Sequence, residues 1–296
     1  MQNLTPCLWF DNEAEEAVIF YTSLFENSAI KKIARFGKEG FEYHHKPEGS
    51  VMTVDFILNG QSFISLNGGP DFKFNESISF FVYCGSEERI NFLYKKLSEG
   101  GSVNMPLDKY DWSPKYAWVK DKFGASWQLD VEDVNSPQKI VPSFLFVNEK
   151  FKRVKEAVNN LTSIFPNSKV ILEFPYDKSL NFPNDTLLFA QFKLNNYLFN
   201  AMSSTLKHNF DFNEAISFII YCNNQDEIDH YWQKLTDGGE EVQCGWLKDK
   251  FGISWQVVPT IFNELMKNPK NASKVMNSMF EMKKFDINKL VEAVNG

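Results

Sequence analysis

The sequence predicts an α+β fold in two tandem domains, and two observations carry this prediction. The first is a repeat, because NESISFFVYCGSEERINFLYKKLSEGG at residues 75–101 recurs as NEAISFIIYCNNQDEIDHYWQKLTDGG at 213–239. The two starts, 75 and 213, differ by the length of a small domain, which is too long for a solenoid or propeller repeat. The second is that strand-like and helix-like patterns follow the order βαβββ twice within each copy. We therefore expect four βαβββ units, two in each domain.

The first unit opens with LTPCLWF, an alternating and aromatic segment that is typical of a strand. Asp11 or Asn12 can cap the helix that follows, in which apolar residues recur at helical spacing. The turn-forming pair Asn59 and Gly60 predicts a hairpin between the last two strands. The four strands expected in this unit cover residues 4–10, 28–37, 50–59 and 61–69.

The second unit repeats this order with an apolar strand, an amphipathic helix at 86–100 and three further strands. Residues 102–116 have no full counterpart in the second copy and predict a long hairpin arm in the first copy alone. KDKFG occurs in both copies; it indicates either a functional Lys–Asp pair or, as we prefer, a turn with Gly124 and Gly252 at its special backbone position. The four strands expected here cover residues 77–84, 101–107, 115–121 and 125–131.

We divide the chain into a first domain at 1–136, a second at 137–260 and a helical tail at 261–296. Pro137 and Pro142 flank the predicted linker. In the tail, apolar residues such as Val275 and Leu290 lie on helical repeats. Because a free tail would expose them as a patch, we expect the tail to pack on the body of the molecule.

The composition argues against several classes of partner. A net charge of -7 with no stripe of Lys and Arg excludes nucleic acid and an acidic membrane surface as expected partners. No apolar run reaches the roughly 20 residues of a membrane span, and no signal peptide is visible at the start, so we expect a cytoplasmic protein. The four cysteines lack Cys-x-x-Cys spacing and are interpreted as reduced structural thiols: Cys7, Cys84, Cys222 and Cys244.

Long stretches of the chain resemble a known family. They include TPCLWFDNEAEEAVIFYTSLFENS, CGWLKDKFGISWQVVP and the tail from FNELMKNPKN onward. These stretches resemble the PhnB-like family, also labelled 3-demethylubiquinone-9 3-methyltransferase, of the vicinal oxygen chelate superfamily that includes glyoxalase I and extradiol dioxygenases. The resemblance implies two tandem glyoxalase-like domains, each of paired βαβββ units forming a curved sheet, with a ligand on the concave face.

The resemblance also implies positions for a metal, and the residues there do not suit one. Metal-dependent members carry His, Glu or Gln ligands near the starts of the first and fifth strands and on the fourth and eighth. Here those stretches supply no set of about three strong ligands, so we expect no metal and no cofactor. The residues in question are Thr5, Cys7, Ser65, Ser77, Ser79 and Gln128 in the first copy, and Val141, Ser143, Ala201, Ser217 and Gln256 in the second.

We expect the first copy to hold the better ligand pocket, because it keeps more of the family's stretches and alone has the long arm. Gln128 takes the place where related enzymes hold a Glu ligand, and Gln256 is its equivalent with a smaller expected role. An alternative is that Trp9 and Trp118 belong to the core. The pocket is expected to be lined by Trp9, Tyr21, Phe72, Trp118 and Gln128.

The leading functional prediction is recognition of a small, partly aromatic molecule by two domains packed as an internal pseudo-dimer. A homodimer of the whole chain is left open. One competing class is an enzyme, either with an atypical metal site or acting through Tyr21 and Gln128. The methyltransferase label is disfavoured, because no G-x-G occurs and the helix and strand order does not match a doubly wound fold. A third class is a structural or interaction role with degenerate cups.

Overall fold

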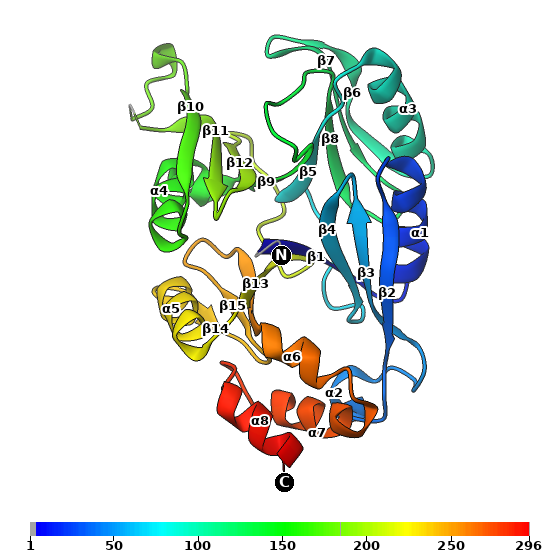
Figure 1. Cartoon of the computed structure of the whole chain (residues 1–296). Helices are drawn as coiled ribbons and strands as arrows, with labels where there is room; N and C mark the ends of the chain where they lie inside the picture. Colours follow the sequence, from blue (N-terminus) through cyan, green and yellow to red (C-terminus); the bar gives the residue numbers. More distant parts are fainter. Residues whose placement is uncertain (1–3, 184, 296) are drawn as a thin grey trace.

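A computed structural model of the chain, which describes residues 4–183 and 185–295, contains two eight-stranded curved sheets. The sheets lie back to back, with their concave faces opening at opposite ends of the molecule (Figure 1). Sheet A holds β1 (Leu4–Phe10), β2 (Ala29–Arg35), β3 (Val51–Leu58), β4 (Gln61–Asn67), β13 (Ile216–Cys222), β14 (Glu240–Glu241), β15 (Trp246–Lys248) and β16 (Ser254–Pro259). Sheet B holds β5 (Ile78–Tyr83), β6 (Ser102–Tyr110), β7 (Ser113–Lys120), β8 (Ser126–Asp130), β9 (Ile140–Phe146), β10 (Lys169–Pro175), β11 (Leu187–Leu194) and β12 (Tyr197–Ser203).

Each sheet combines one unit from each sequence copy. The strand order is β14-β15-β16-β13-β1-β4-β3-β2 in sheet A and β10-β11-β12-β9-β5-β8-β7-β6 in sheet B. Sheet A therefore joins the first and fourth units through antiparallel β1 and β13, and sheet B joins the second and third through antiparallel β5 and β9. This pairing differs from the expectation that each copy forms its own sheet. The division at residues 136 and 137 separates two sequence copies, while β8 and β9 on either side of it belong to one sheet.

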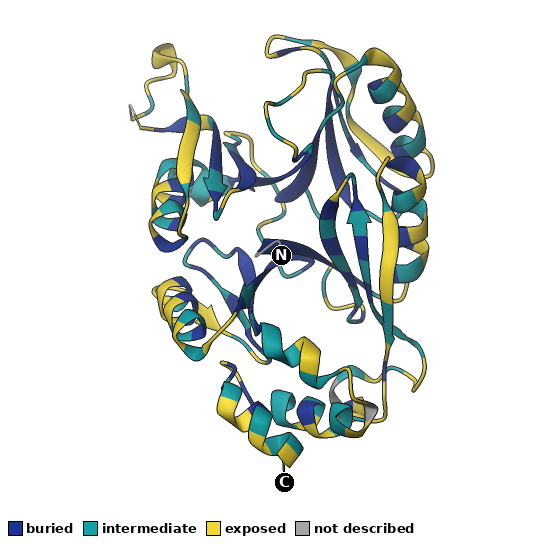
Figure 2. Ribbon diagram, in the orientation of Figure 1, coloured by how far each residue is buried: buried dark blue, intermediate teal, exposed yellow. Residues whose placement is uncertain are grey.

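The helices pack on the convex faces of the two sheets. The residues on the convex faces form one common core. Figure 1 shows α1 and α3 along one flank and α4 and α5 along the other. Central strands are buried while the edge strands β2 and β10 are largely exposed (Figure 2). The helices are α1 (Ala14–Leu24), α2 (Phe41–His44), α3 (Glu87–Ser98), α4 (Val154–Ile164) and α5 (Gln225–Thr236), with short 3-10 turns at Asn148–Arg153 and Lys178–Leu180.

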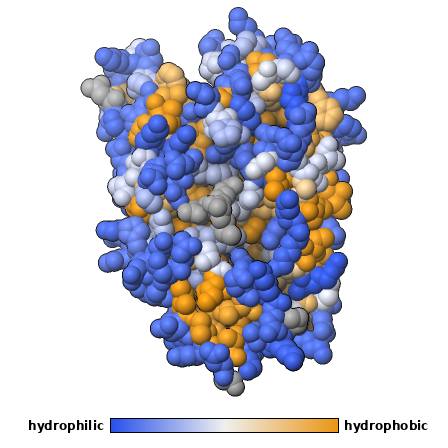
Figure 3. All heavy atoms as spheres, viewed as in Figure 1, coloured by the Kyte–Doolittle hydropathy of each residue, from blue (hydrophilic) through white to orange (hydrophobic). Residues whose placement is uncertain are grey.

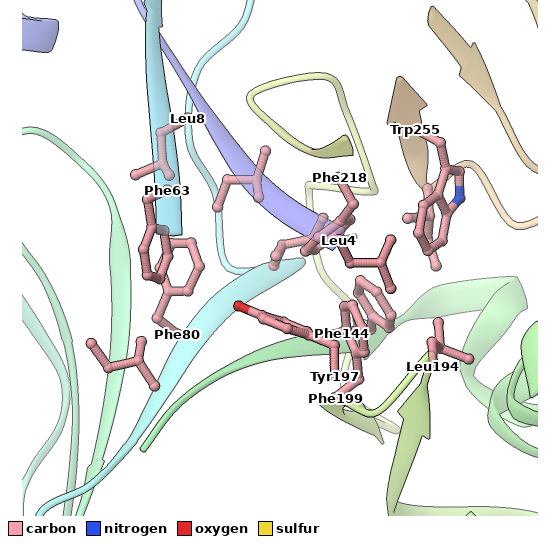
Figure 4. Packing of buried hydrophobic residues seen from close by; sticks show 14 of the residues in the cluster. Leu4, Leu8, Phe63, Phe80, Phe144, Leu194, Tyr197, Phe199, Phe218 and Trp255 are labelled. Carbon is pink, nitrogen blue, oxygen red and sulfur yellow. The ribbon is translucent and has the colours of Figure 1, made fainter. Parts of the chain in front are cut away.

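The two sheets are held together by aromatic side chains between their convex faces. Phe63 of sheet A and Phe80 of sheet B have ring centroids 5.6 Å apart, and Phe144 and Phe218 form the equivalent pair at 5.5 Å. Figure 4 shows these rings facing one another with Leu4 and Leu8 nearby. Because strand side chains alternate, every core-facing residue is followed by one that faces the concave side. The positions of the core aromatics therefore identify which residues line each concave face.

The repeated KDKFG segments form tight turns around a buried aspartate. Asp121 accepts hydrogen bonds from the backbone N–H of Phe123 and Ala125, the Trp127 indole and the Tyr21 hydroxyl. Asp249 accepts the corresponding bonds in the other copy from Phe251, Ile253 and the Trp255 indole. The turn interpretation of this motif is confirmed, with Gly124 and Gly252 both at positive φ.

The buried Asp249 should make stability depend on pH. Burial raises the pKa of its carboxyl from 3.8 to about 6, so folding favours the protonated form. This contribution to stability is fully present below pH 3.8 and is lost as the pH rises through about 6. Chemical denaturation from pH 4 to pH 7 should show the wild type losing stability relative to Asp249→Asn, which cannot titrate. The exposed substitution Glu240→Gln is the control, and a difference independent of pH would contradict this prediction.

The tail forms three helices that cross the open side of sheet A. They are α6 (Thr260–Leu265), α7 (Pro269–Phe280) and α8 (Ile287–Asn295). At one end the backbone N–H groups of Cys244 and Gly245, just before β15, donate to the tail carbonyls of Met282 and Lys283. At the other end, Ser273 of α7 donates a hydrogen bond to Glu39 in the loop after β2. The tail thus connects both edges of sheet A, as Figure 1 shows, and the prediction that it packs on the body is confirmed.

No helix within the described residues is long and apolar enough to cross a membrane.

Candidate functional site

A row of neutral polar side chains crosses the concave face of sheet B. Ser79, Ser143, Asn200 and Gln191 are successive register partners on β5, β9, β12 and β11. All four are buried. Gln128 on β8 continues the row, because its amide Nε2 donates to the Ser79 hydroxyl at 2.7 Å. Five adjacent strands therefore place five hydroxyl or amide groups along one line.

Tyrosines complete hydrogen bonds at both ends of this row. The Tyr116 hydroxyl donates to Gln128 Oε1 at 2.6 Å, and the Gln191 amide donates to the Tyr83 hydroxyl at 2.9 Å. Burial raises the pKa of Tyr83 to about 12 and holds that of Tyr116 well above its usual value. Both hydroxyls consequently stay protonated near neutral pH, and the row carries no charge.

Asn200 is the one member of the row with an unmet hydrogen-bonding group. Its Oδ1 accepts from Gln191 at 3.1 Å, while its Nδ2 lies next to the Tyr83 hydroxyl and makes no hydrogen bond of good geometry to any described residue. The side chain is fully buried. A buried amide donor without a partner is costly in a folded protein, on the order of 1–3 kcal/mol. Such a donor at the centre of a concave face is suited to an acceptor atom of a ligand.

Apolar and aromatic side chains surround the polar row. Phe81, Tyr116, Val141 and Leu198 form a small cluster separate from the main core. Trp118 lies beside Gln128 in the register of β7 and β8, and its indole N–H donates to the Ser126 hydroxyl at 2.7 Å. This surrounding wall and the row together have the usual composition of a small-molecule site, which is mostly apolar with a few placed polar groups.

Two arms flank the opening of this face. One is the predicted hairpin, formed by β6 and β7, in which Tyr110 and Trp112 stack at 5.1 Å beside Tyr116. The other is formed by β10 and β11 on the opposite edge of the sheet. Figure 3 shows the surface indented between these two arms. A cavity of about 670 Å³ lies elsewhere, between the end of α4 and the start of α5.

Sheet A has a corresponding row of different character. Cys7 is the register partner of Ser217 on β13 and of Ile64 on β4, and Ile64 is the partner of Asp55 on β3. The Gln256 amide donates to the Ser217 hydroxyl at 2.9 Å, as Gln128 does to Ser79. Burial raises the pKa of Cys7 to about 12, so its thiol is neutral. This row contains a carboxylate where sheet B has the amide of Gln191.

The structure does not bring the predicted pocket residues together. Trp118 and Gln128 lie on the concave face of sheet B, whereas Trp9 and Phe72 lie at that of sheet A, with their rings 5.0 Å apart. Gln256 belongs to the floor of sheet A. Trp9 is partly exposed and faces away from the core, and its ring passes so close to Gly68 that a Cβ there would meet it at 2.2 Å.

The placement of Tyr21 in the pocket is corrected. Tyr21 lies on α1, is fully buried on the convex side, and donates its hydroxyl to Asp121 at 2.8 Å. Helical spacing placed it on the buried face of α1, and that face packs on the core rather than on the concave side.

The comparisons with known proteins agree with the duplicated architecture. The family model described as 3-demethylubiquinone-9 3-methyltransferase matches twice, at residues 2–130 and 138–258. The chain belongs to this family. A PhnB protein from Bacillus cereus is 40% identical, with 44% of this chain and 98% of that chain covered and a TM-score of 0.40. A search of curated proteins found no match.

Glyoxalase I from Zea mays has a similar fold to this chain over most of both chains. The match covers 89% of this chain and 94% of that chain with a TM-score of 0.56, at 8% sequence identity. At that identity the likeness shows the fold alone. It confirms the predicted glyoxalase-like fold, and the two matches of the family model confirm the tandem duplication.

The donor groups of this family member do not fit the superfamily's metal site. In sheet B, the four concave-face residues compared with metal ligands are Ser79, Gln128, Ser143 and Asn200. In sheet A they are Cys7, Ile64, Ser217 and Gln256. Neither set offers a carboxylate or an imidazole, and Cys7 with the glutamines does not supply the three or so converging ligands that such a metal needs. Within the described chain, no group of three or more His, Cys, Asp or Glu residues is arranged to hold a metal ion.

Sequence reasoning missed Asn200 and Asp55, and it misplaced two neighbours. Ser65 and Ala201 were taken as the inward residues of their strands, but both face the convex side, where Ser65 pairs in register with Leu8 and Val54. A shift of one residue moves every side chain of a strand to the other face. The alternation FNAM on β12, with Phe199 in the core, is the signal that identifies Asn200 as inward.

Proposed function

We propose that the concave face of sheet B binds a small, partly aromatic molecule whose polar edge carries a hydrogen-bond acceptor. The single observation that carries the proposal is the fully buried Asn200 amide with its unpaired Nδ2. Gln191 fixes the orientation of Asn200 by donating to its Oδ1, while Gln128 donates to Ser79 and Ser143 donates to the Val141 carbonyl.

The character of the row supports a ligand without negative charge. The hydroxyls and amides of the row carry no charge near neutral pH, because the pKa values of Tyr83 and Tyr116 are raised by burial. An anionic ligand would lose its hydration without finding a counter-ion in the row, and the Asp130 carboxylate beside Tyr83 and Tyr116 would repel it. An aromatic body instead matches the rings of Phe81, Tyr116 and Trp118 that surround the row.

Binding should therefore depend on the Asn200 donor only when the probe has an acceptor. We would measure the affinity of acetophenone and of isopropylbenzene, which replaces the carbonyl with an apolar group of similar shape, by ligand-detected NMR. Asn200→Leu should weaken acetophenone binding roughly 2- to 13-fold, the effect of one neutral hydrogen bond. The same substitution should leave isopropylbenzene binding almost unchanged.

The pseudo-symmetry of the chain offers a matched control. Gln128→Ala removes the amide that orients the Ser79 end of the row and should also weaken acetophenone binding, whereas Gln256→Ala at the equivalent position in sheet A should not. The proposal would be contradicted if neither probe bound, or if Asn200→Leu affected both probes equally. A stoichiometric metal that is lost in Gln128→Ala would contradict it as well.

A further inference from the structure

The polar row on the concave face of sheet A contains a carboxylate at a position where the row of sheet B has an amide. Asp55 on β3 is the register partner of Ile64 in the row of sheet A. Gln191 on β11 is the register partner of Asn200 in the row of sheet B, so the two residues hold equivalent places. Its neighbours Val54 and Phe56 are fully buried in the core, so the alternation of the strand directs the Asp55 carboxylate to the concave side.

This carboxylate forms no direct ion pair with any described residue. No Lys, Arg or His nitrogen among the described residues lies within the 4.0 Å limit of an ion pair with Asp55, and no side chain there donates a hydrogen bond to it. Lys32, its register partner on the edge strand β2, is the nearest source of positive charge and is exposed to solvent. Burial raises the pKa of Asp55, partly offset by Lys32.

Aromatic rings face the same concave side. Trp246 on β15 is the register partner of Gln256, on the side of the sheet opposite to Asp55. The ring centroids of Trp246 and Trp9 lie 5.9 Å apart in an edge-to-face arrangement. Trp9 is fixed by a hydrogen bond from its indole N–H to the Gly69 carbonyl at 2.8 Å. Tyr221 also faces this side, and its pKa is raised first by burial and then by the charge of Asp55. Tryptophan faces attract organic cations, as does a carboxylate with no partner.

We propose that the concave face of sheet A is a second binding site, selective for a small organic cation such as a substituted ammonium. Asp55 supplies the charge, Trp9 and Trp246 supply the aromatic surface, and the neutral floor of Cys7, Ser217 and Gln256 holds no competing cation. The tail helices span the opening between the two sheet edges and shield this face from bulk water. Shielding strengthens the attraction between a carboxylate and a bound cation.

The experiment compares benzyltrimethylammonium with neopentylbenzene, in which carbon replaces the charged nitrogen. Isothermal titration and tryptophan fluorescence with the full chain should show that the cation binds. Asp55→Asn should weaken that binding roughly 10- to 100-fold, the effect of losing a contact to a charged group, without changing the affinity for neopentylbenzene. Lys32→Gln should strengthen cation binding, because it removes the nearest competing positive charge.

Two controls separate this site from others. Glu48→Gln removes an exposed carboxylate outside the concave face and should leave cation binding unchanged. Asn200→Leu alters the proposed site in sheet B and should also leave cation binding unchanged. The two proposed sites can therefore be tested separately. Absence of cation binding, or equal binding by the wild type and a folded Asp55→Asn protein, would overturn the inference.

Discussion

Residues 1–136 expressed without the rest of the chain are expected to yield no folded monomer. In the intact protein β1 pairs with β13 and β5 pairs with β9, so this segment alone contains two half-sheets with their central strands unpaired. Such strands would expose a row of backbone donors and acceptors together with core residues such as Phe80 and Leu8. The segment should be aggregated, unfolded or assembled into an oligomer that pairs these edges.

Co-expression of residues 1–136 with 137–296 should restore a one-to-one complex with cooperative unfolding. Size-exclusion chromatography with light scattering and circular dichroism would measure both states. As a control, a protease site inserted at Ser136 in the intact chain should allow cleavage without dissociation. A stable monomer of residues 1–136 with a cooperative transition would show that the exchange of units is not required for folding.

Deletion of the chain after residue 260 is expected to lower the free energy of unfolding by several kcal/mol. The tail places four buried side chains in the core, each of which contributes on the order of 1.5–3 kcal/mol before the cost of ordering. Removing them also uncovers their partners at the edge of sheet A. These side chains are Val275, Met282, Phe285 and Leu290.

Point substitutions test the same contact without removing the tail. Phe285→Ala should destabilise the protein by about 3–5 kcal/mol, as expected for a buried phenylalanine. From the other side, Gly245→Ala should also destabilise it, because Gly245 has φ +83 and a Cβ there would meet the Phe285 ring at 2.6 Å. Urea denaturation measures all three proteins. Unchanged midpoints would mean that the tail contributes nothing to the body of the molecule.

The concave faces show how far a pattern in the sequence determines a site. The pairs Trp127–Gln128 and Trp255–Gln256 alternate on their strands, and the structure confirms that tryptophan faces the core while glutamine faces inward. Asn200 was missed because the wrong phase was chosen on β12, which moves the strand's residues to the other face, and Asp55 was missed because no residue of β3 was considered. Trp9 and Gln128 were assigned to one pocket because they are in one copy, although they lie in different sheets.

By itself the sequence determined the duplication, the order of strands and helices, the long arm and the apolar tail. These features depend on local periodicity and on similarity between segments, both of which are visible along the chain. Only the tertiary structure decided that β1 pairs with β13 rather than with β5. Backbone hydrogen bonds between strands are the same for every residue type, so the sequence carries little information about which unit completes a sheet. The pairing joins residues far apart in the chain, such as Cys7 with Ser217, and it forms only in the folded molecule.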